Sequence, residues 1–314
     1  MAPLLGPVLG PIVGGFITEY TTWRWVFWTV SIADRFVQLL GLILLRETFA
    51  PHILASKARE LRKETGNEVW HTKWETPNRT LVNILKAALV RPFILLGTQP
   101  IIQILALYLA YLYGVVYLVL TTLPTLWTVR YHESIGIAGL NYISLGIGYL
   151  IGTQSTARLN DRLYKSFKER DGKGVGQPEF RLPLLIPGSI LVPTGIFWYG
   201  WSAQAHLHWI MPNIGLVIFG LGMKIATQCT QSYGIDTYPL YAASAGAAST
   251  FLRSLAGFGF PLFAPYMYQR LGYGWGNSLI AFLAIILGIP APFVLWKYGP
   301  WLRAKSQYAA GGAD

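Results

Sequence analysis

Four ionisable side chains lie inside long apolar stretches of the sequence, namely Asp34, Arg35, Lys224 and Arg253. An ionised group near the centre of a bilayer costs at least about 2.5–3.5 kcal/mol, so such groups usually face a cavity or a partner. Asp34 is the candidate of the four for carrying a proton. The pattern therefore predicts a proton or substrate relay formed by Asp34, Arg253 and Lys224. The alternative is structural, with pairing between helices or with long side chains reaching toward the membrane surface.

Uncharged polar residues could complete a cavity around these charges. Gln99 and Gln103 are four residues apart and would share one face of a helix, and Gln228 lies in a later apolar stretch. Sparse hydrogen-bonding groups among tyrosines and aliphatic residues suit an amphipathic organic ligand. The sequence contains no P-loop, no metal-ligand cluster and no catalytic motif, so we expect neither an enzyme nor a bound cofactor or metal.

The elements that must position these residues are long apolar helices. A membrane-crossing helix needs about 20 mostly apolar residues, and eight stretches qualify. They are 2–19, 24–45, 94–120, 135–156, 183–201, 209–231, 242–264 and 276–297. The composition agrees, because 53% of the 314 residues are hydrophobic and only 12% are charged. We therefore expect an all-α, polytopic membrane protein, and we exclude a disordered chain and a scaffold of disulfides, since Cys229 is a single cysteine.

The basic residues predict which side of the membrane each loop faces. The net charge is +11, but the lysines and arginines alternate with apolar stretches and form no stripe that would bind nucleic acid. They gather instead in 46–92, in 157–182 and after the last apolar stretch, which fall on one side if the helices alternate in direction. Excess positive charge marks the cytoplasmic side. Residues 57–64 within the first of these stretches have the composition of a surface helix, either beside the membrane or in solution.

A glycine–proline pattern in the first stretch carries more specific information. Gly6, Gly10 and Gly14 recur every four residues, Pro11 follows the second glycine, and Gly15 follows the third. Glycines at this spacing form a flat helix face that permits close approach of a neighbouring helix. Generic packing through small residues is the alternative.

This segment resembles the antiporter signature of the fifth helix of exporters in the major facilitator superfamily. Further segments resemble fungal drug:proton antiporters of that superfamily, namely 23–28, 46–51, 63–67, 178–183 and 233–238. The resemblance implies the last two helices of an N-terminal half in 1–45, a cytoplasmic central loop in 46–92, a six-helix C-terminal half in 93–298 and a cytoplasmic tail in 299–314. Because it begins at the family's fifth helix, it also implies an N-terminally truncated transporter, which we expect to be unstable and inactive by itself.

The segment 157–165 resembles the second copy of the superfamily's G-x-x-x-D-R-x-x-R/K loop, with Ala157 in place of the leading glycine. The resemblance implies a cytoplasmic latch formed by Asp161, Arg162 and Lys165, in which the aspartate pairs with an arginine. A basic loop that only sets topology is the alternative.

The function implied is proton-coupled export of small organic molecules, with the lipid bilayer, the substrate and protons as partners and no obligate protein partner. Uptake of a nutrient or polyamine by the same fold is one alternative, and a non-transporting membrane scaffold or fragment is another. The resemblance to fungal exporters favours the plasma membrane, with the vacuolar membrane as the second choice.

Overall fold

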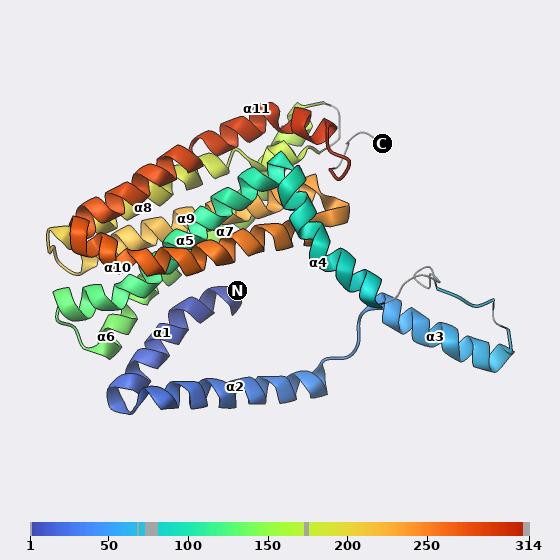
Figure 1. Cartoon of the computed structure of the whole chain (residues 1–314), viewed down its shortest axis with the longest axis horizontal. Coiled ribbons are helices and arrows are strands. Elements are labelled where there is room, and N and C mark those ends of the chain that lie inside the picture. The colour runs from blue at the N-terminus through green and yellow to red at the C-terminus, as the bar shows by residue number, and fades with distance from the viewer. Residues whose placement is uncertain (1, 68, 73–80, 173–175, 310–314) are drawn as a thin grey trace. The chain divides into compact units, whose positions relative to one another are not determined.

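The computed structural model describes residues 2–67, 69–72, 81–172 and 176–309, and within these ranges the chain is helical and contains no strand. Its elements are α1 (Ala2–Tyr20), α2 (Trp23–Leu44), α3 (Ala50–Thr65), α4 (Leu81–Thr98), α5 (Pro100–Thr125), the π-helix η1 (Leu126–Arg130), α6 (Ile135–Leu140), α7 (Tyr142–Arg170), the 3-10 helix η2 (Pro178–Arg181), α8 (Leu185–Gln204), α9 (Ile210–Thr237), the 3-10 helix η3 (Pro239–Tyr241), α10 (Ala242–Gly288) and α11 (Pro290–Ala304) (Figure 1). This confirms the all-α class.

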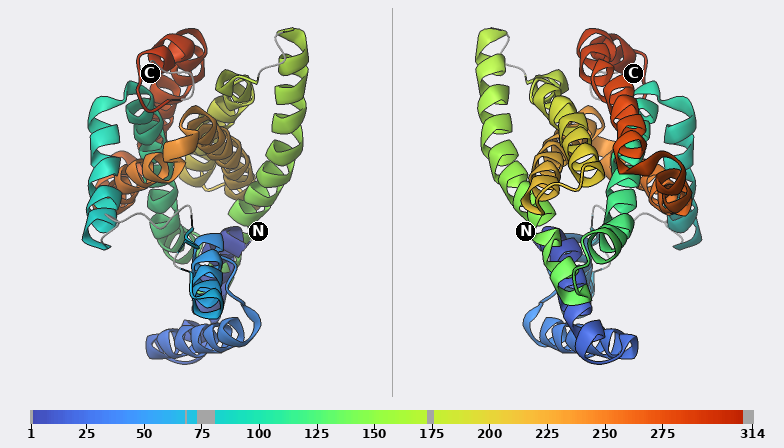
Figure 2. Two further views of the ribbon diagram at one scale, coloured as in Figure 1. Left: turned by 90° about the vertical axis from the view of Figure 1, so that its right-hand side faces the viewer. Right: turned by 90° about the vertical axis from the view of Figure 1, so that its left-hand side faces the viewer.

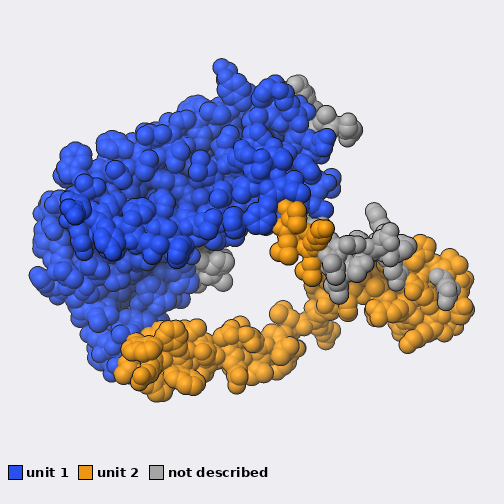
Figure 3. All heavy atoms as spheres, in the orientation of Figure 1, with its two compact units in different colours: residues 1–21, 91–314 blue, residues 22–90 orange. Residues whose placement is uncertain are grey.

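The chain divides into two compact units, which Figure 3 shows in different colours. Unit 1 consists of residues 1–21 and 91–314, and unit 2 of residues 22–90. Unit 2 holds α2, α3 and the first part of α4. In α2 no residue is buried, whereas α3 begins with a proline in its first turn and ends at Gly66, which takes the left-handed conformation (φ 64°) that glycine adopts without strain.

Unit 1 is a helical bundle in which α5, α7, α8, α9, α10 and α11 run beside one another (Figures 1 and 2). Close approach between α8 and α9 depends on glycine. A Cβ atom on Gly188 would lie 3.0 Å from the backbone nitrogen of Ala226, and one on Gly222 would lie 2.7 Å from the backbone nitrogen of Val192. Small residues of this kind let apolar helices pack backbone to backbone where the hydrophobic effect cannot drive association.

Six helical segments among the described residues are long and apolar enough to cross a membrane. The last of them, Pro239–Ala304, has 66 residues, far more than one crossing needs. It reverses direction at Gly272, whose φ of 70° is left-handed. The Tyr268 hydroxyl lies 3.0 Å from Oδ1 of Asn277, nine residues on, which a straight helix does not permit. This segment therefore provides both of the last two predicted stretches.

The third predicted stretch, 94–120, contains a break. Residue Gln99 is extended (φ −107°, ψ 104°), so α4 ends at Thr98 and α5 begins at Pro100. The cause is local, because a residue before proline is driven out of the helical region by the proline ring. The fourth stretch, 135–156, continues as helix to Arg170, well into the predicted 157–182 loop. Residues 157–171 contain no glycine or proline that would end the helix earlier.

Candidate functional site

A pocket of about 230 Å³ opens between α5, α9 and α10 in unit 1. Its wall combines aliphatic residues with hydroxyl, amide and guanidinium groups. The lining residues are Ile102, Leu105, Leu109, Thr230, Gln231, Gly234, Ile235, Tyr238, Ala242, Ala245, Gly246, Ser249, Thr250 and Arg253. An apolar wall with a few polar groups is typical of a site for a small organic molecule.

Arg253 of α10 is the charged residue of this wall. Its guanidinium carbon lies 4.4 Å from the ring centroid of Tyr113 on α5, within the range of a cation–π interaction. Tyr113 is half-buried, and the neighbouring Tyr117 rests against Gly257 of α10, where an added Cβ atom would lie 2.9 Å from the tyrosine ring. The tyrosines of α5 therefore fix the position of α10, and with it the position of Arg253.

Lys224 makes a second contact of the same kind. Its Nζ lies 5.7 Å from the ring centroid of Tyr149 on α7, and its Cβ lies against Gly152 of α7, where an added Cβ atom would be 2.7 Å away. Tyr149 is buried. Each of the two predicted cations therefore lies against a tyrosine ring of a neighbouring helix, Arg253 against Tyr113 and Lys224 against Tyr149.

Within the described part of the chain, neither Arg253 nor Lys224 forms an ion pair with a carboxylate. A cation–π contact is worth about 0.5–2 kcal/mol, whereas an arginine or lysine at the centre of a membrane helix costs about 2.5–3.5 kcal/mol on the lowest scale. The ring contacts therefore offset only part of the cost, and a net positive charge remains beside the pocket.

The three glutamines proposed for a cavity lie elsewhere. Gln99 is buried at the α4–α5 break, where its Oε1 accepts a hydrogen bond from Ser306 at 2.6 Å. Gln103 donates to the carbonyl oxygens of Leu96 and Gly97 and so covers the same break. Gln228 is exposed on α9. The pocket wall includes none of them, and the amide it does include is that of Gln231.

Asp34 belongs to unit 2, whereas Lys224 and Arg253 belong to unit 1. It is exposed on α2 and accepts a hydrogen bond of 2.8 Å from Gln38, one turn along the same helix. A local amide donor of this kind orients the carboxylate without neutralising it.

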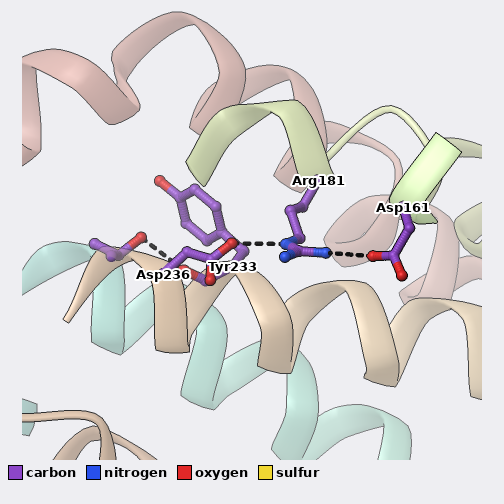
Figure 4. Close-up of polar contacts among 5 residues, drawn as sticks. Asp161, Arg181, Tyr233 and Asp236 are labelled. Atoms are coloured by element: carbon purple, nitrogen blue, oxygen red, sulfur yellow. Dashed lines mark hydrogen bonds and ion pairs between the residues drawn. The ribbon is translucent and has the colours of Figure 1, made fainter. Parts of the chain in front are cut away.

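The predicted latch segment takes part in a charge network at one end of unit 1 (Figure 4). Nε of Arg181 donates to Asp236 at 2.6 Å, and the same guanidinium reaches Asp161 at 3.4 Å. The Tyr164 ring lies 4.7 Å from the Arg181 guanidinium carbon. Asp161 is thus paired with an arginine, but this arginine comes from η2 and shares its charge mainly with α9. Arg162 and Lys165 are exposed on α7.

A second pair lies at the same end of the bundle. Glu179 of η2 is buried and accepts two hydrogen bonds from Arg303 of α11, at 3.0 and 2.8 Å. A bidentate pair of this geometry is among the stronger ion pairs in proteins. Gly299 of α11 lies against both this pair and Tyr233. A Cβ atom on Gly299 would lie 2.8 Å from Oε1 of Glu179 and 2.9 Å from the Tyr233 hydroxyl. Segment 178–181 therefore connects α7, α9 and α11.

The glycine–proline segment of α1 packs against α6 and α7, all within unit 1. A Cβ on Gly15 would lie 3.0 Å from the carbonyl oxygen of Ile135, and one on Gly139 would lie 3.0 Å from that of Pro11. Gly6 and Gly10, by contrast, have open space where a Cβ would stand, and the Gly14 carbonyl accepts a hydrogen bond from Thr18. The close contact of α1 with α6 therefore depends on Gly139 of α6 as well as on Gly15 of α1.

Carboxylates also mark the opposite end of the bundle. The Glu19 Oε2 atom at the end of α1 accepts hydrogen bonds from Ser134 and from the backbone of Gly136, at 3.1 and 2.5 Å, which ties α1 to the start of α6. Glu133 accepts from Asn141 at 2.7 Å. Burial raises the pKa of the Glu133 carboxyl, and the hydrogen bond from Asn141 opposes that shift.

Sequence reasoning missed the partners of several of these groups. Arg181 and Asp236 both lie in segments that resemble the transporter family, but they are 55 residues apart and no spacing rule connects them. Glu19 lies near the end of an apolar stretch, and nothing in the sequence around it indicates that it binds Ser134 and Gly136. Tyr113 and Tyr149 were indistinguishable by sequence from tyrosines at the membrane surface.

These helices, the pocket between them and the sparse interior charges define a multi-pass membrane protein. The sequence profile of the Major Facilitator Superfamily matches residues 2–261, and the chain belongs to this family. It is 53% identical over 311 residues to the efflux pump vrtL of Penicillium aethiopicum, covering 99% of this chain and 61% of that protein.

Two further relatives are similar over nearly the whole chain. It is 45% identical over 308 residues to the MFS-type transporter oryF of Aspergillus oryzae, covering 98% of this chain and 63% of the relative. It is 41% identical over 309 residues to the probable efflux pump mfs2 of Aspergillus flavus, covering 98% and 73%. The chain thus spans less than two thirds of the length of vrtL and oryF. The family and the fold agree with the resemblance found in the sequence.

Proposed function

We propose that this chain acts in the proton-coupled export of small organic molecules. The observation that carries the proposal is the pocket between α5, α9 and α10, whose wall contains Arg253. Sites of secondary transporters lie near the middle of the membrane and are exposed to each side in turn as packed helices rock. Export, as opposed to uptake, is supported by the glycine–proline segment of α1 and by relatives that are named efflux pumps.

Orientation and organisation belong to the same proposal. We place residues 46–92 and 299–314 in the cytosol and treat 93–298 as the six-helix C-terminal half, with 1–45 as the last two helices of the other half. The Asp161–Arg181–Asp236 network would then lie at the cytoplasmic end, where breaking and remaking it would accompany rocking. The plasma membrane is the first choice of location and the vacuolar membrane the second.

Asp34 is the proposed proton carrier, and Arg253 and Lys224 are its proposed cationic partners during transport. Gln38 orients the carboxylate, which forms no ion pair within the described ranges, and such a group suits proton transfer in each cycle. Energy would come from the ion gradient.

The test is an efflux assay on cells that carry the gene at its own locus, compared with cells in which it is deleted. Cells are loaded with fluorescent organic probes, and retention is followed with and without a protonophore. We expect the deletion to increase retention, the protonophore to remove the difference, and Arg253→Gln to behave like the deletion. Equal retention in the two strains for every probe, or lower uptake in the deleted strain, would contradict the proposal.

A further inference from the structure

We propose that the pocket beside Arg253 accepts an organic anion that carries an aromatic ring. The inference rests on the proposed transport function and adds the charge and shape of the molecule. The basic residues of unit 1 that matter here fall into two sets: Arg181 and Arg303 are paired with carboxylates, whereas Arg253 and Lys224 lie against tyrosine rings.

The first set is neutralised by the protein itself. Arg181 is shared by Asp161 and Asp236, and Arg303 is held by both oxygens of Glu179. These pairs lie at one end of the bundle, where segment 178–181 meets α7, α9 and α11. Their charge is therefore already satisfied by the fold, and nothing is left for a ligand to complete.

The second set, Arg253 and Lys224, forms no ion pair with a carboxylate among the residues that the structure describes. Acidic residues between 100 and 304 stand toward helix ends or in loops, at Glu133, Asp161, Glu169, Asp171, Glu179 and Asp236. Arg253 and Lys224, both partly buried, face tyrosine rings instead. A ring face attracts a cation but leaves its positive charge in place. The free edge of the Arg253 guanidinium can still donate two parallel hydrogen bonds, a geometry that matches a carboxylate or an enolate.

The rest of the pocket indicates what the anion is attached to. Ile102, Leu105 and Leu109 of α5 form an aliphatic part of the wall, while Thr250 of α10 and Gln231 of α9 offer hydrogen bonds. An apolar ring can contact the aliphatic part, and its polar substituents can reach the amide and the hydroxyl. An organic cation would meet positive charge without a carboxylate to balance it, which costs binding free energy.

The experiment compares three probes that share one ring system and differ in charge: 1-naphthoate, 1-naphthamide and 1-naphthylmethylammonium. Binding to the purified protein in lipid nanodiscs is measured by equilibrium dialysis. We expect naphthoate to bind at least about tenfold more tightly than naphthamide, which is the lower end of the contribution of hydrogen bonds to charged groups. The ammonium probe should bind least.

Variants connect this preference to the residue. Arg253→Gln should reduce naphthoate binding to the level of naphthamide while naphthamide binding stays unchanged, and Arg253→Lys should retain part of the preference. Arg270→Gln, which removes an exposed cation near the Gly272 reversal, is the matched control and should change nothing. If Arg253→Gln does not fold, the charge series on the unmodified protein and on Arg253→Lys decides the question. Equal binding of the three probes, tightest binding of the ammonium probe, or an unchanged preference in Arg253→Gln overturns the inference.

Efflux of the same probes separates this inference from the proposed function. Extrusion of naphthamide or the ammonium probe without extrusion of naphthoate would leave transport standing and overturn the anion preference. Preferential naphthoate binding without extrusion of any probe would overturn transport and support the anion site.

Discussion

Replacing Asp236 with asparagine should destabilise the protein more than the same replacement at Asp161, although both carboxylates contact Arg181. The Asp236 contact is short, at 2.6 Å, and its side chain is 29% exposed. The Asp161 contact is 3.4 Å long and its side chain is 72% exposed. A partly buried, charge-assisted hydrogen bond contributes about 1.5–3 kcal/mol, whereas an exposed ion pair of this length contributes about 0.5 kcal/mol or less.

Asparagine keeps the size and one acceptor oxygen, so the change reports the loss of charge. At about 2.1 cal/mol/K of unfolding entropy per residue, a chain of 314 residues shifts its Tm by about 1.5 °C per kcal/mol. Asp236→Asn should therefore lower the apparent Tm of the purified protein by about 2–5 °C, and Asp161→Asn by about 1 °C or less. Glu169→Gln, at an exposed carboxylate on the same helix as Asp161, serves as control.

The ranking is the critical result. Equal losses at the two positions, or a larger loss for Asp161→Asn, would refute the reasoning from distance and exposure. Transport rate provides a second measurement, because the proposed latch at Asp161 predicts altered efflux in Asp161→Asn without loss of stability. Unchanged efflux in that variant would leave Asp161 with no role beyond a weak surface contact.

Three further predictions concern other parts of the chain. Burial raises the native pKa of Glu133, so its ionisation opposes folding; stability should fall as pH rises from about 4.5 through that higher pKa, and Glu133→Gln should flatten this dependence in thermal shift assays. Asp34→Asn should abolish the pH dependence of efflux while leaving the amount of protein in the membrane unchanged, because it removes the proton-binding group and keeps the shape. Gly139→Val should lower the apparent Tm by overpacking against the Pro11 carbonyl, at a cost of about 1–3 kcal/mol.

Each of these has a control in the same chain. Gly259→Val places a side chain where nothing lies within 4 Å, so a comparable loss there would show that overpacking is not the cause at Gly139. Glu169→Gln should leave the pH profile of stability as it is, and an unchanged profile in Glu133→Gln would contradict the role given to burial. Efflux by Asp34→Asn with an unaltered pH profile would return Asp34 to a structural role.

The sequence was sufficient to predict the helices that depend on local rules. Apolar length located the segments that became α1, α2, α8 and α9, because a membrane-crossing helix must satisfy its own backbone and stay apolar over a fixed length. Helix boundaries were predicted less well. Hydropathy alone predicts a helix that ends at residue 156, whereas α7 continues to Arg170, because residues 157–171 contain no glycine or proline.

Contacts between distant segments could not be predicted in the same way. The cations Arg253 and Lys224 were found from their charge, but the rings that hold them come from α5 and α7, and a single sequence does not reveal which tyrosine faces inward. Gln99 and Gln103 lie outside the pocket wall for a physical reason. Pro100 breaks the helix beside them, and amides next to a break are used to satisfy backbone and neighbouring hydroxyl groups.

The same charged residue type thus serves two purposes in unit 1, and burial alone does not separate them. Arg181 and Arg253 are both partly buried on helical elements. Arg181 lies between two carboxylates from different helices, so its charge stabilises one arrangement of those helices. Arg253 lies beside a pocket with a tyrosine ring as its neighbour, so its charge remains available to whatever enters. A substitution at Arg181 should therefore be felt first in stability, and a substitution at Arg253 first in ligand binding.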